Sequence, residues 1–519
     1  MTVPRSPAPG TAPPEQSGPD ALAAEQEQPW LRLDKRMLLV HPVDEAVKLL
    51  PVLLISLVVG TQSGNHYWGL IALSVLVAYA IARWFTTSYR IGPVHVQLRT
   101  GVFQRKVLSV PRNRIRSVDV EAGLLHRVLG LSVVRIGTGQ RAEKPGESAR
   151  FELNALDARL VPALREALLF THGATDSPEA SDPTQAPRGV EIAHWSPSWV
   201  RYAPLSTTGV LTVAAAVGLV FQYGLGQRVA DSDTISEGLD VLRGWGVAAA
   251  VTIGVVALVA IASALACVRY LLTFGNLTVT DDGRVLHVSH GLLRTRQTTL
   301  DRARLRGTSL REPLLLRLAG AARLDAVMTG VSADQRFSSL LLPQAPRPEV
   351  QRVESLVLQS RDATPLHSHG PAAQRRRYSR ALLPVVVLAA AVGVADTAGA
   401  PIGWPVWTAV AILAVAAGLL AHDRYRGLGH ATPPGRLVTR HGSLDRGRHT
   451  VDADGIVAWT VRQTFFQRRA GVATVIAATP AGTGHYDVLD IPADEAWSLV
   501  ETVTPGAGDI WARGVGERR

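Results

Sequence analysis

The run Leu124-Leu-His-Arg127-Val-Leu-Gly130 occurs three times in this sequence, each time with an arginine three positions before the final glycine. It returns as Leu314-Leu-Leu-Arg317-Leu-Ala-Gly320 and as Phe465-Phe-Gln-Arg468-Arg-Ala-Gly471. An opening glycine stands 29 positions before each closing glycine, and these opening residues are Gly101, Gly291 and Gly442. Because the three stretches align without a gap and lie far apart, we predict three copies of one domain rather than a tight solenoid.

The composition fits water-soluble domains that alternate with membrane segments. The chain has 519 residues, of which 47% are hydrophobic and 19% are charged, and its formal net charge is +11. It is too apolar for an ordinary soluble protein and too polar for a pure membrane bundle. The single cysteine, Cys267, excludes an internal disulfide and is interpreted as a small residue of a membrane helix. Residues 1–28 lack the apolar core of a signal peptide and are predicted to form a disordered cytosolic tail.

Six apolar segments predict three transmembrane hairpins, at residues 46–85, 203–267 and 381–421. The individual spans are predicted at 46–61, 67–85, 203–223, 244–267, 381–398 and 402–421. The first of them is short, and a re-entrant segment is the alternative there. Arginine and lysine flank the outer ends of the hairpins, whereas the connectors are neutral or acidic. By the positive-inside rule, both termini and all three domains are predicted to face the cytoplasm of a multi-pass protein in a bacterial plasma membrane.

The segments that follow the hairpins predict three domains, at residues 86–170, 268–360 and 424–505, with linkers at 171–193 and 361–377. Alternating apolar and polar residues predict strands in each domain. Helical spacing predicts a closing helix near 157–169, 347–358 and 494–501. Asp282-Gly283 between two alternating runs predicts a hairpin with a type I′ turn. Each domain is therefore expected to be an antiparallel β-structure closed by one C-terminal helix.

The alignment of the copies separates core positions from surface positions. Branched apolar residues, which strands favour, stand nine, fourteen and nineteen positions after the opening glycine, and we assign them to the core. They are Val110, Leu300, Val451, Ile115, Leu305, Ile456, Val120, Leu310 and Val461. The closing run begins with two large apolar residues: Leu124-Leu125, Leu314-Leu315 and Phe465-Phe466. Packing of the pair in the core is the favoured interpretation, and contact of one member with a neighbour or with lipid is the alternative.

Arginines are the candidate binding residues. Arg112 and Arg114 in the first copy, and Arg302 and Arg304 in the second, stand eleven and thirteen positions after the opening glycine. On a strand, this spacing would put both side chains on one face, about 7 Å apart, where they could bracket a phosphate or an anionic lipid headgroup. A solvated basic strand without a pocket is the simpler interpretation. The third copy has Ala453 and Gly455 instead, so any such site is absent from it.

The arginines of the closing run form a second set of candidates, because they occur in all three copies. They are Arg127, Arg317 and Arg468. Their place beside a glycine favours a structural role, in which the side chain donates hydrogen bonds to carbonyls of a turn; ligand binding is the alternative. The six opening and closing glycines are likewise interpreted as structural residues of turns.

Several short stretches resemble a known family. Tyr89-Arg-Ile-Gly, Gly101-Val-Phe, Pro111-Arg-Asn-Arg-Ile-Arg-Ser-Val and the closing run resemble the bacterial pleckstrin-homology-like domain of YdbT-type membrane proteins. The resemblance covers most of the chain outside the tail and linkers, and in the third copy it depends mainly on the register and the closing run. It implies a seven-stranded antiparallel β-sandwich or barrel with a C-terminal helix. No reaction is assigned to this family, so lipid or protein binding is the expectation that the fold implies.

No catalytic pattern is found in the sequence. It contains no Walker A loop, no H-E-x-x-H, no G-x-S-x-G and no Cys/His set with metal-ligand spacing, and His367 and His369 are predicted to lie in a flexible linker. We therefore predict a protein that is not an enzyme and has no metal or cofactor. Its predicted partners are membrane lipids and a protein partner or a second copy, without nucleic acid.

Two functional hypotheses follow from the sequence. The first is a membrane-anchored scaffold that acts in cell-envelope maintenance or stress resistance. The second is an oligomeric transport or export component, in which the cytosolic domains form a collar. Ionisable residues in the predicted spans are few, with Lys48 and Asp396 near span ends. This argues against a proton-coupled pump, which requires charged groups at depth in the membrane.

Overall fold

The computed structural model describes residues 28–36, 82–137, 151–161 and 189–218 with short gaps, and residues 247–329, 339–360 and 365–507. The chain divides into two compact units, with the boundary between Ser181 and Asp182. The first unit contains the first repeat, and the second unit contains the second and third repeats.

Two antiparallel sheets form the first repeat. The first sheet consists, in spatial order, of β1 (Leu31–Arg32), β2 (Ser88–Ile91), β3 (His95–Thr100) and β4 (Lys106–Pro111). The second consists of β5 (Ser117–Ala122), β6 (Leu131–Gly137) and β7 (Phe151–Asp157), with the short helix α4 (Leu124–Val128) between β5 and β6. Val96 and Phe151 come from different sheets and share one buried cluster, so the two sheets pack face to face.

The second repeat has the same order of elements. Its first sheet contains β8 (Val190–His194), β9 (Thr278–Asp281), β10 (Val285–His290) and β11 (Thr295–Asp301). Its second sheet contains β12 (Leu305–Pro313), β13 (Ala321–Met328) and β14 (Leu340–Pro346). The short helix α10 (Leu314–Leu318) follows β12, and α11 (Arg347–Leu358) closes the repeat at the predicted residues.

The third repeat has three strands in each sheet, one fewer in its first sheet than the other two repeats. They are β15 (Gly429–Ala431), β16 (Arg436–His441) and β17 (Asp445–Asp452), then β18 (Ala458–Arg462), β19 (Val472–Ala478) and β20 (His485–Pro492). The short helix α14 (Phe465–Ala470) follows β18, and α15 (Glu495–Val503) closes the repeat. Closing helices are thus present in the second and third repeats, whereas residues 162–169 of the helix predicted near 157–169 lie outside the described residues.

The first strand of each repeat comes from the segment upstream of its predicted membrane hairpin. β1 pairs with β2, β8 pairs with β9, and in the third repeat His367 forms an isolated bridge with His430. The domain limits that begin at 86, 268 and 424 therefore leave out one strand or bridge each, and the linker predicted at 171–193 contains most of β8. Such short strands carry too few alternating residues to be recognised from sequence. Each repeat thus includes chain from both sides of its hairpin.

A single sheet joins the second and third repeats. β12 pairs with β17 in antiparallel register from Gly307↔Val451 to Pro313↔Asp445, which gives a six-stranded sheet with the order β14-β13-β12-β17-β16-β15. A small buried cluster of Val327, Val451, Ala481 and Tyr486 lies across the same joint. The two repeats are therefore one continuous structure.

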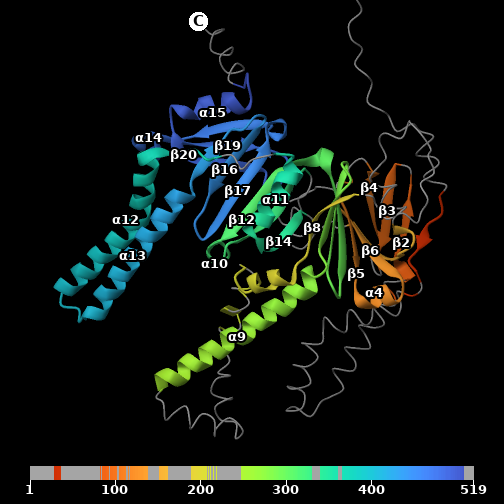
Figure 1. Ribbon diagram of the computed structural model, residues 1–519, viewed down its shortest axis with the longest axis horizontal. Helices are drawn as coiled ribbons and strands as arrows, with labels where there is room; N and C mark the ends of the chain where they lie inside the picture. The colour runs from red at the N-terminus through yellow and green to blue at the C-terminus, as the bar shows by residue number, and fades with distance from the viewer. Residues whose placement is uncertain are drawn as a thin grey trace, which may run out of the picture. The chain divides into compact units, whose positions relative to one another are not determined.

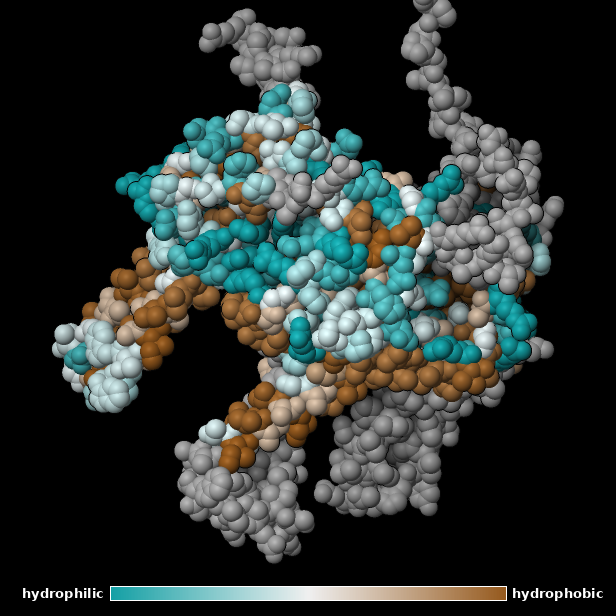
Figure 2. All heavy atoms as spheres, in the orientation of Figure 1, coloured by the Kyte–Doolittle hydropathy of each residue, from teal (hydrophilic) through white to brown (hydrophobic). Residues whose placement is uncertain are grey.

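Three described helices are long and apolar enough to cross a membrane. They are α9 (Val247–Phe274), α12 (Gly370–Thr397) and α13 (Trp404–Gly427), and the last two pack as a hairpin (Figures 1 and 2). The prediction of six transmembrane helices is thus not supported beyond these three. The segment 46–61 and most of the segments 67–85 and 203–223 fall outside the described residues.

The described helices extend past the apolar windows that predicted them. α9 continues from the predicted limit at 267 to Phe274, and α12 begins at Gly370, inside the segment 361–377 that was predicted as a linker. A helix, once formed, propagates through residues such as the glutamine and arginines at the start of α12, which have good helix propensity but are polar. The apolar part of α12 is therefore connected to the third repeat by a mostly polar base of about three turns, Gly370–Arg380.

The glycines that define the repeat have a common backbone conformation. The opening glycines Gly101, Gly291 and Gly442 have φ values of 124°, 107° and 104°, and the closing glycines Gly130, Gly320 and Gly471 have values of 69°, 71° and 68°. Residues with a Cβ atom rarely adopt these positive φ angles. The carbonyl oxygen of each closing glycine accepts a hydrogen bond from the residue just after the last strand: Ala158, Arg347 and Ala493.

The predicted core positions are buried in the first two repeats. All six of them, from Val110 to Leu310, are at most 9% exposed, whereas Ile456 and Val461 in the third repeat are only partly buried. The hairpin at Asp282-Gly283 is confirmed, but a type I′ turn is wrong because only Gly283 has positive φ, at 85°. The Asp282 side chain instead accepts hydrogen bonds from the backbone N–H groups of Arg284 and Val285, which stabilises the other turn.

Candidate functional sites at the helix ends

The arginine pair of the second repeat does not lie on a strand. Arg302 and Arg304 belong to a 3₁₀ turn, η3 (Arg302–Arg304), in which residues two apart point in different directions. Arg302 pairs with both carboxylate oxygens of Asp281, and Arg304 pairs with Asp301, Nε to Oδ2, at 3.2 Å. Burial alone would raise the pKa of Asp281, but hydrogen bonds from Arg302 and Gly283 lower it. The predicted phosphate bracket is therefore not formed here.

The corresponding residues of the other repeats also make internal contacts. Arg112 donates from Nη1 to the carbonyl of Gly92 at 3.4 Å, and burial lowers its pKa; Arg114 is outside the described residues. The third repeat has no aligned arginine, but Arg436 at the start of β16 contacts the same helix end as Arg302. Arg302 and Arg436 donate to the carbonyls of Val357 and Leu358 at 3.2 and 2.6 Å. Two guanidinium groups thus bind the otherwise unpaired carbonyls at the end of α11.

The closing-run arginines have different surroundings in the three repeats. Arg317 is half-buried and reaches the third repeat, whereas Arg127 and Arg468 are exposed. Arg317 donates from Nη1 to the carbonyl of Ser443 at 3.4 Å, and this carbonyl is not in its own turn. The feature that all three copies share is a backbone bond from the closing glycine N–H to the arginine carbonyl. For Arg317, the predicted hydrogen bond to a carbonyl of its own turn is replaced by contacts with the third repeat, and the common side-chain role stays a prediction.

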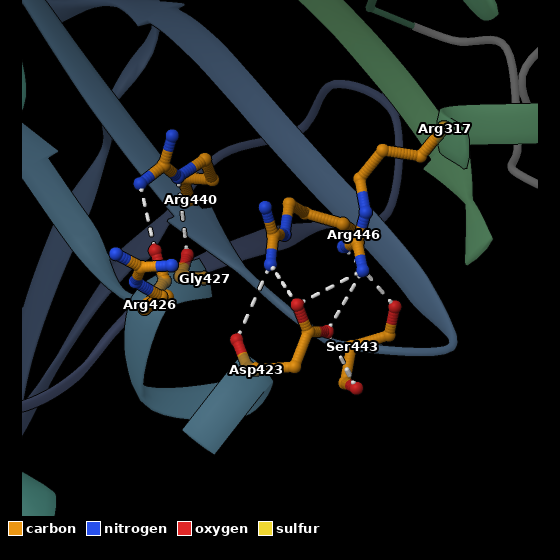
Figure 3. A network of polar contacts seen from close by, with 7 residues as sticks. All are labelled: Arg317, Asp423, Arg426, Gly427, Arg440, Ser443 and Arg446. Atoms are coloured by element: carbon orange, nitrogen blue, oxygen red, sulfur yellow. Dashed lines mark hydrogen bonds and ion pairs between the residues drawn. The ribbon is translucent and has the colours of Figure 1, made fainter. Parts of the chain in front are cut away.

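Asp423 makes polar contacts with three side chains near the end of α13 (Figure 3). Arg317 Nη2 contacts both carboxylate oxygens at 2.9 Å, Arg446 Nη2 contacts Oδ1 at 2.9 Å, and Ser443 Oγ donates to Oδ2 at 2.8 Å. Arg440 donates to the carbonyls of Gly427 and Arg426 at 3.2 and 3.0 Å. The end of this apolar helix is thus fixed to both the second and the third repeat.

Asp490 plays the matching role at the start of α12. Its side chain is 3% exposed and lies 3.0 Å from Arg376 and 2.8 Å from Arg377. Gln467 of α14 donates to the same carboxylate at 2.9 Å. The two arginines precede the apolar part of α12, so this buried cluster holds the base of that helix against the second sheet of the third repeat.

A group of histidines lies beside this cluster. His369 is 1% exposed, and its ring nitrogens lie 2.9 Å from His430 Nδ1 and 2.7 Å from the carbonyl of Leu489. The prediction that His367 and His369 lie in a flexible linker is wrong, because residues 367–370 pack between β15 and β20. Burial, followed by the charges of His369 and His367, lowers the pKa of His430 to about 4.

We expect the third repeat to lose stability as the pH falls from 6.5 toward 4. In this window the unfolded state binds a proton at His430 that the folded state excludes, so acid favours unfolding, by up to roughly 3 kcal/mol for this group. Thermal unfolding of the full chain at pH 7 and pH 5 should show the loss, and His430→Asn should reduce it. Substitution of the exposed His485 by asparagine is the control. If the thermal midpoint fell equally between pH 7 and pH 5 in His430→Asn and in wild type, this assignment would be contradicted.

Five of the six apolar residues that open the closing runs are exposed in the folded repeats, and the sixth, Leu314, is partly buried. Leu124 and Leu125 are 51% and 39% exposed, Leu315 is 43% exposed, and Phe465 and Phe466 are 73% and 71% exposed. The favoured interpretation of core packing is therefore wrong. The buried position is the next one along: His126, Leu316 and Gln467 are at most 8% exposed. The short helix turns this third residue inward. Because the three copies have His, Leu and Gln at this position, residue type alone does not indicate that it is buried.

A polar cavity of about 520 Å³ lies between α11 and the first sheet of the third repeat. Glu354 on its wall is 7% exposed, accepts a hydrogen bond from Thr308 at 3.0 Å, and has a pKa raised by burial. Arginines and carboxylates are equal in number among its lining residues: Arg306, Arg436, Arg448, Glu354, Asp452 and Asp454. This balance does not favour an anionic ligand. In the described residues, no three His, Cys, Asp or Glu side chains are grouped as a metal site.

Comparison with known proteins identifies the repeats. The family model for the bacterial PH domain matches residues 46–169, 216–361 and 383–504. The chain is 21% identical over 312 residues to the UPF0699 transmembrane protein YdbT of Bacillus subtilis (strain 168). That alignment covers 56% of this chain and 60% of the relative. No solved structure matches.

These matches agree with the structure. The three apolar helices and the transmembrane relative place the protein in a membrane. Each matched range includes a predicted membrane segment and the strands that follow it. This is expected if the helices and the sheets form one repeating unit. The matched ranges together cover more than half of the sequence, so the chain belongs to the bacterial PH domain family.

Proposed function

We propose that this protein is a non-enzymatic, membrane-anchored scaffold whose three repeats bind lipid headgroups or a protein partner at the cytoplasmic face. The observation that carries the proposal is the way each repeat includes a strand or bridge from upstream of its membrane segment. A domain built around the base of its own anchor is held close to the bilayer. The sheet that joins the second and third repeats adds a continuous platform, which suits a scaffold better than independent modules on linkers.

The charge distribution supports the cytoplasmic orientation. Arg375, Arg376, Arg377 and Arg380 lie at the base of α12, and Arg424 and Arg426 lie at the base of α13. The connector between the two helices, residues 398–403, contains no charged residue. Positive charge near short loops is retained in the cytoplasm during insertion, so the basic side is expected to be cytoplasmic.

Cysteine labelling tests this orientation. In a Cys267→Ser background, Ala400→Cys marks the α12–α13 connector and Thr460→Cys marks an exposed edge strand of the third repeat. A membrane-impermeant maleimide should label Ala400→Cys in intact spheroplasts, but Thr460→Cys only after permeabilisation. The reverse labelling would place the repeats outside and contradict the cytoplasmic proposal.

Co-purification tests the binding role. The full chain, extracted from its native membrane in a mild detergent, should retain anionic phospholipids above their share of the bulk lipid, or a protein partner in fixed proportion. Bulk lipid composition together with the absence of a stoichiometric partner would contradict the scaffold. Solute flux through proteoliposomes, with a homo-oligomer in detergent, would favour a transport component instead.

A further inference from the structure

The two aromatic side chains that open α14 are among the most exposed apolar residues of the third repeat. Phe465 and Phe466 are 73% and 71% exposed, and their rings form an edge-to-face pair with centroids 5.5 Å apart. A soluble domain gains nothing from holding two adjacent phenylalanines in water, because exposed apolar groups of this size mark contacts with a partner or a membrane. Their exposure therefore requires an occupant for the tip of α14.

The helix that carries this pair is bonded to the base of a membrane helix. Gln467, the residue after Phe466, is 5% exposed and donates to Asp490, which in turn pairs with Arg376 and Arg377 of α12. The apolar part of α12 begins after Arg380, three to four residues later, or about 5–6 Å along the helix axis. Figure 1 shows α14 beside the end of α12 that joins the repeat. Phe465 and Phe466 thus lie close to the depth at which the bilayer begins.

The sequence of α14 changes from aromatic to basic within one turn. Arg468 and Arg469 follow Gln467, and both are exposed. Long basic side chains can keep their charged ends among phosphates while aromatic rings enter the boundary below the headgroups. The order Phe-Phe-Gln-Arg-Arg therefore places two exposed aromatic rings, one buried hydrogen-bonded glutamine and two exposed arginines in succession.

The ends of the other described membrane helices have similar apolar neighbours. At α13, Ser443 is bonded to Asp423, and the next residue, Leu444, is 57% exposed. The Leu444 carbonyl accepts the N–H of Leu314, which brings α10 with Leu315 and the 75% exposed Leu318 to the same place. At α9, the N–H of Leu292 donates to the carbonyl of Leu272, and Leu292 and Leu293 are 37% and 43% exposed.

We infer that α14 is an interfacial anchor that inserts Phe465 and Phe466 at the boundary between lipid headgroups and acyl chains, with Arg468 and Arg469 at the level of the phosphates. The occupant is the bilayer that holds α12 and α13, because the surface is continuous with the ends of those helices. The inference depends on this membrane anchoring and deepens the lipid part of the proposed function. Leu444 and the exposed leucines of α10 extend the same contact.

A depth measurement on the full chain tests the anchor. In a Cys267→Ser background, Phe465→Cys and Trp497→Cys each receive an environment-sensitive fluorophore, and the protein is reconstituted in phosphatidylcholine vesicles. Trp497 is the matched control, because it is 51% exposed but belongs to α15, on the side of the third repeat away from the helical hairpin (Figure 1). The label at 465 should emit at shorter wavelength and be quenched by lipids that carry a nitroxide near the headgroup. The label at 497 should be quenched by aqueous iodide.

Two results would overturn the inference. One is equal quenching of both labels by iodide. The other is protection of the label at 465 in native membranes but not in pure lipid vesicles, which would identify a protein as the occupant. Arg468→Gln with Arg469→Gln should remove any added quenching that phosphatidylglycerol produces, while the signal in phosphatidylcholine remains. If the label at 465 is inserted but anionic lipid is not enriched on co-purification, the anchor is supported and the proposed lipid-binding role is contradicted. The anchor and the lipid-binding role can therefore be tested separately.

Discussion

Replacement of Gly307 by alanine is expected to separate the second repeat from the third. Gly307 opens the paired region of β12 and has a φ of 140°. A Cβ atom there would lie 1.9 Å from the carbonyl oxygen of Thr450 and 3.0 Å from the Cα atom of Val451, both backbone atoms of β17. Neither a rotamer change nor a small shift relieves such contacts. We expect a loss on the order of 4 kcal/mol from steric overlap and backbone strain together.

Hydrogen exchange on the full chain can locate this effect. Gly307→Ala should reduce amide protection in residues 307–313 and 445–451, the two sides of the joint, and lower the thermal midpoint. Gly435→Ala is the matched control, since its φ is 70° but no heavy atom lies within 4 Å of the added methyl group. The control should cost only about 1–2 kcal/mol for the left-handed conformation. Unchanged protection across β12 and β17 in Gly307→Ala would show that the repeats are not held by this pairing.

Gly307 also illustrates which features of the fold can be predicted from the sequence and which cannot. The strands, the closing helices of the last two repeats and most core positions follow from periodicity, because side-chain alternation reports burial directly. Pairing between strands of different repeats depends on backbone hydrogen bonds, which leave little trace in residue type. One trace was present: the positions aligned with Gly307 are Ser117 and Ala458, so only the second copy has glycine at this point. A copy-specific glycine within a strand indicates a close backbone approach.

The phosphate site predicted at Arg302 and Arg304 is not formed, for a related reason. The spacing of Arg302 and Arg304 puts their side chains on one face only if the segment is a strand. The segment is a single 3₁₀ turn, so the two side chains point in different directions. The acidic partners were also hidden, because Asp281 lies on another strand and Asp423 lies in a membrane helix far along the chain. The exposed aromatic pair of α14 was visible in the sequence, but its orientation depends on which residue of a short helix turns inward.

The largest effect on the α12–α13 hairpin is expected from Asp490→Asn. Asp490 has a φ of 55°, which asparagine tolerates, and the amide can still bond with Gln467. What is lost is the negative charge between Arg376 and Arg377, whose side chains are 10% and 14% exposed. Two buried guanidinium groups without a counter-charge are strongly unfavourable, and removal of one partner from such a cluster costs about 3–5 kcal/mol.

Asp423→Asn provides the comparison at the other helix of the hairpin. The Asp423 side chain is 30% exposed, so solvent screens its arginine partners, and we expect only about 1–2 kcal/mol there. Thermal unfolding of the full chain in lipid nanodiscs should therefore rank Asp490→Asn well below Asp423→Asn, with new protease cleavage near residues 365–370 in the former. Adding Arg376→Met and Arg377→Met to Asp490→Asn should recover much of the loss, because an apolar cluster needs no counter-charge. A triple variant no more stable than Asp490→Asn would mean that the carboxylate acts through its bond with Gln467 and not through the two arginines.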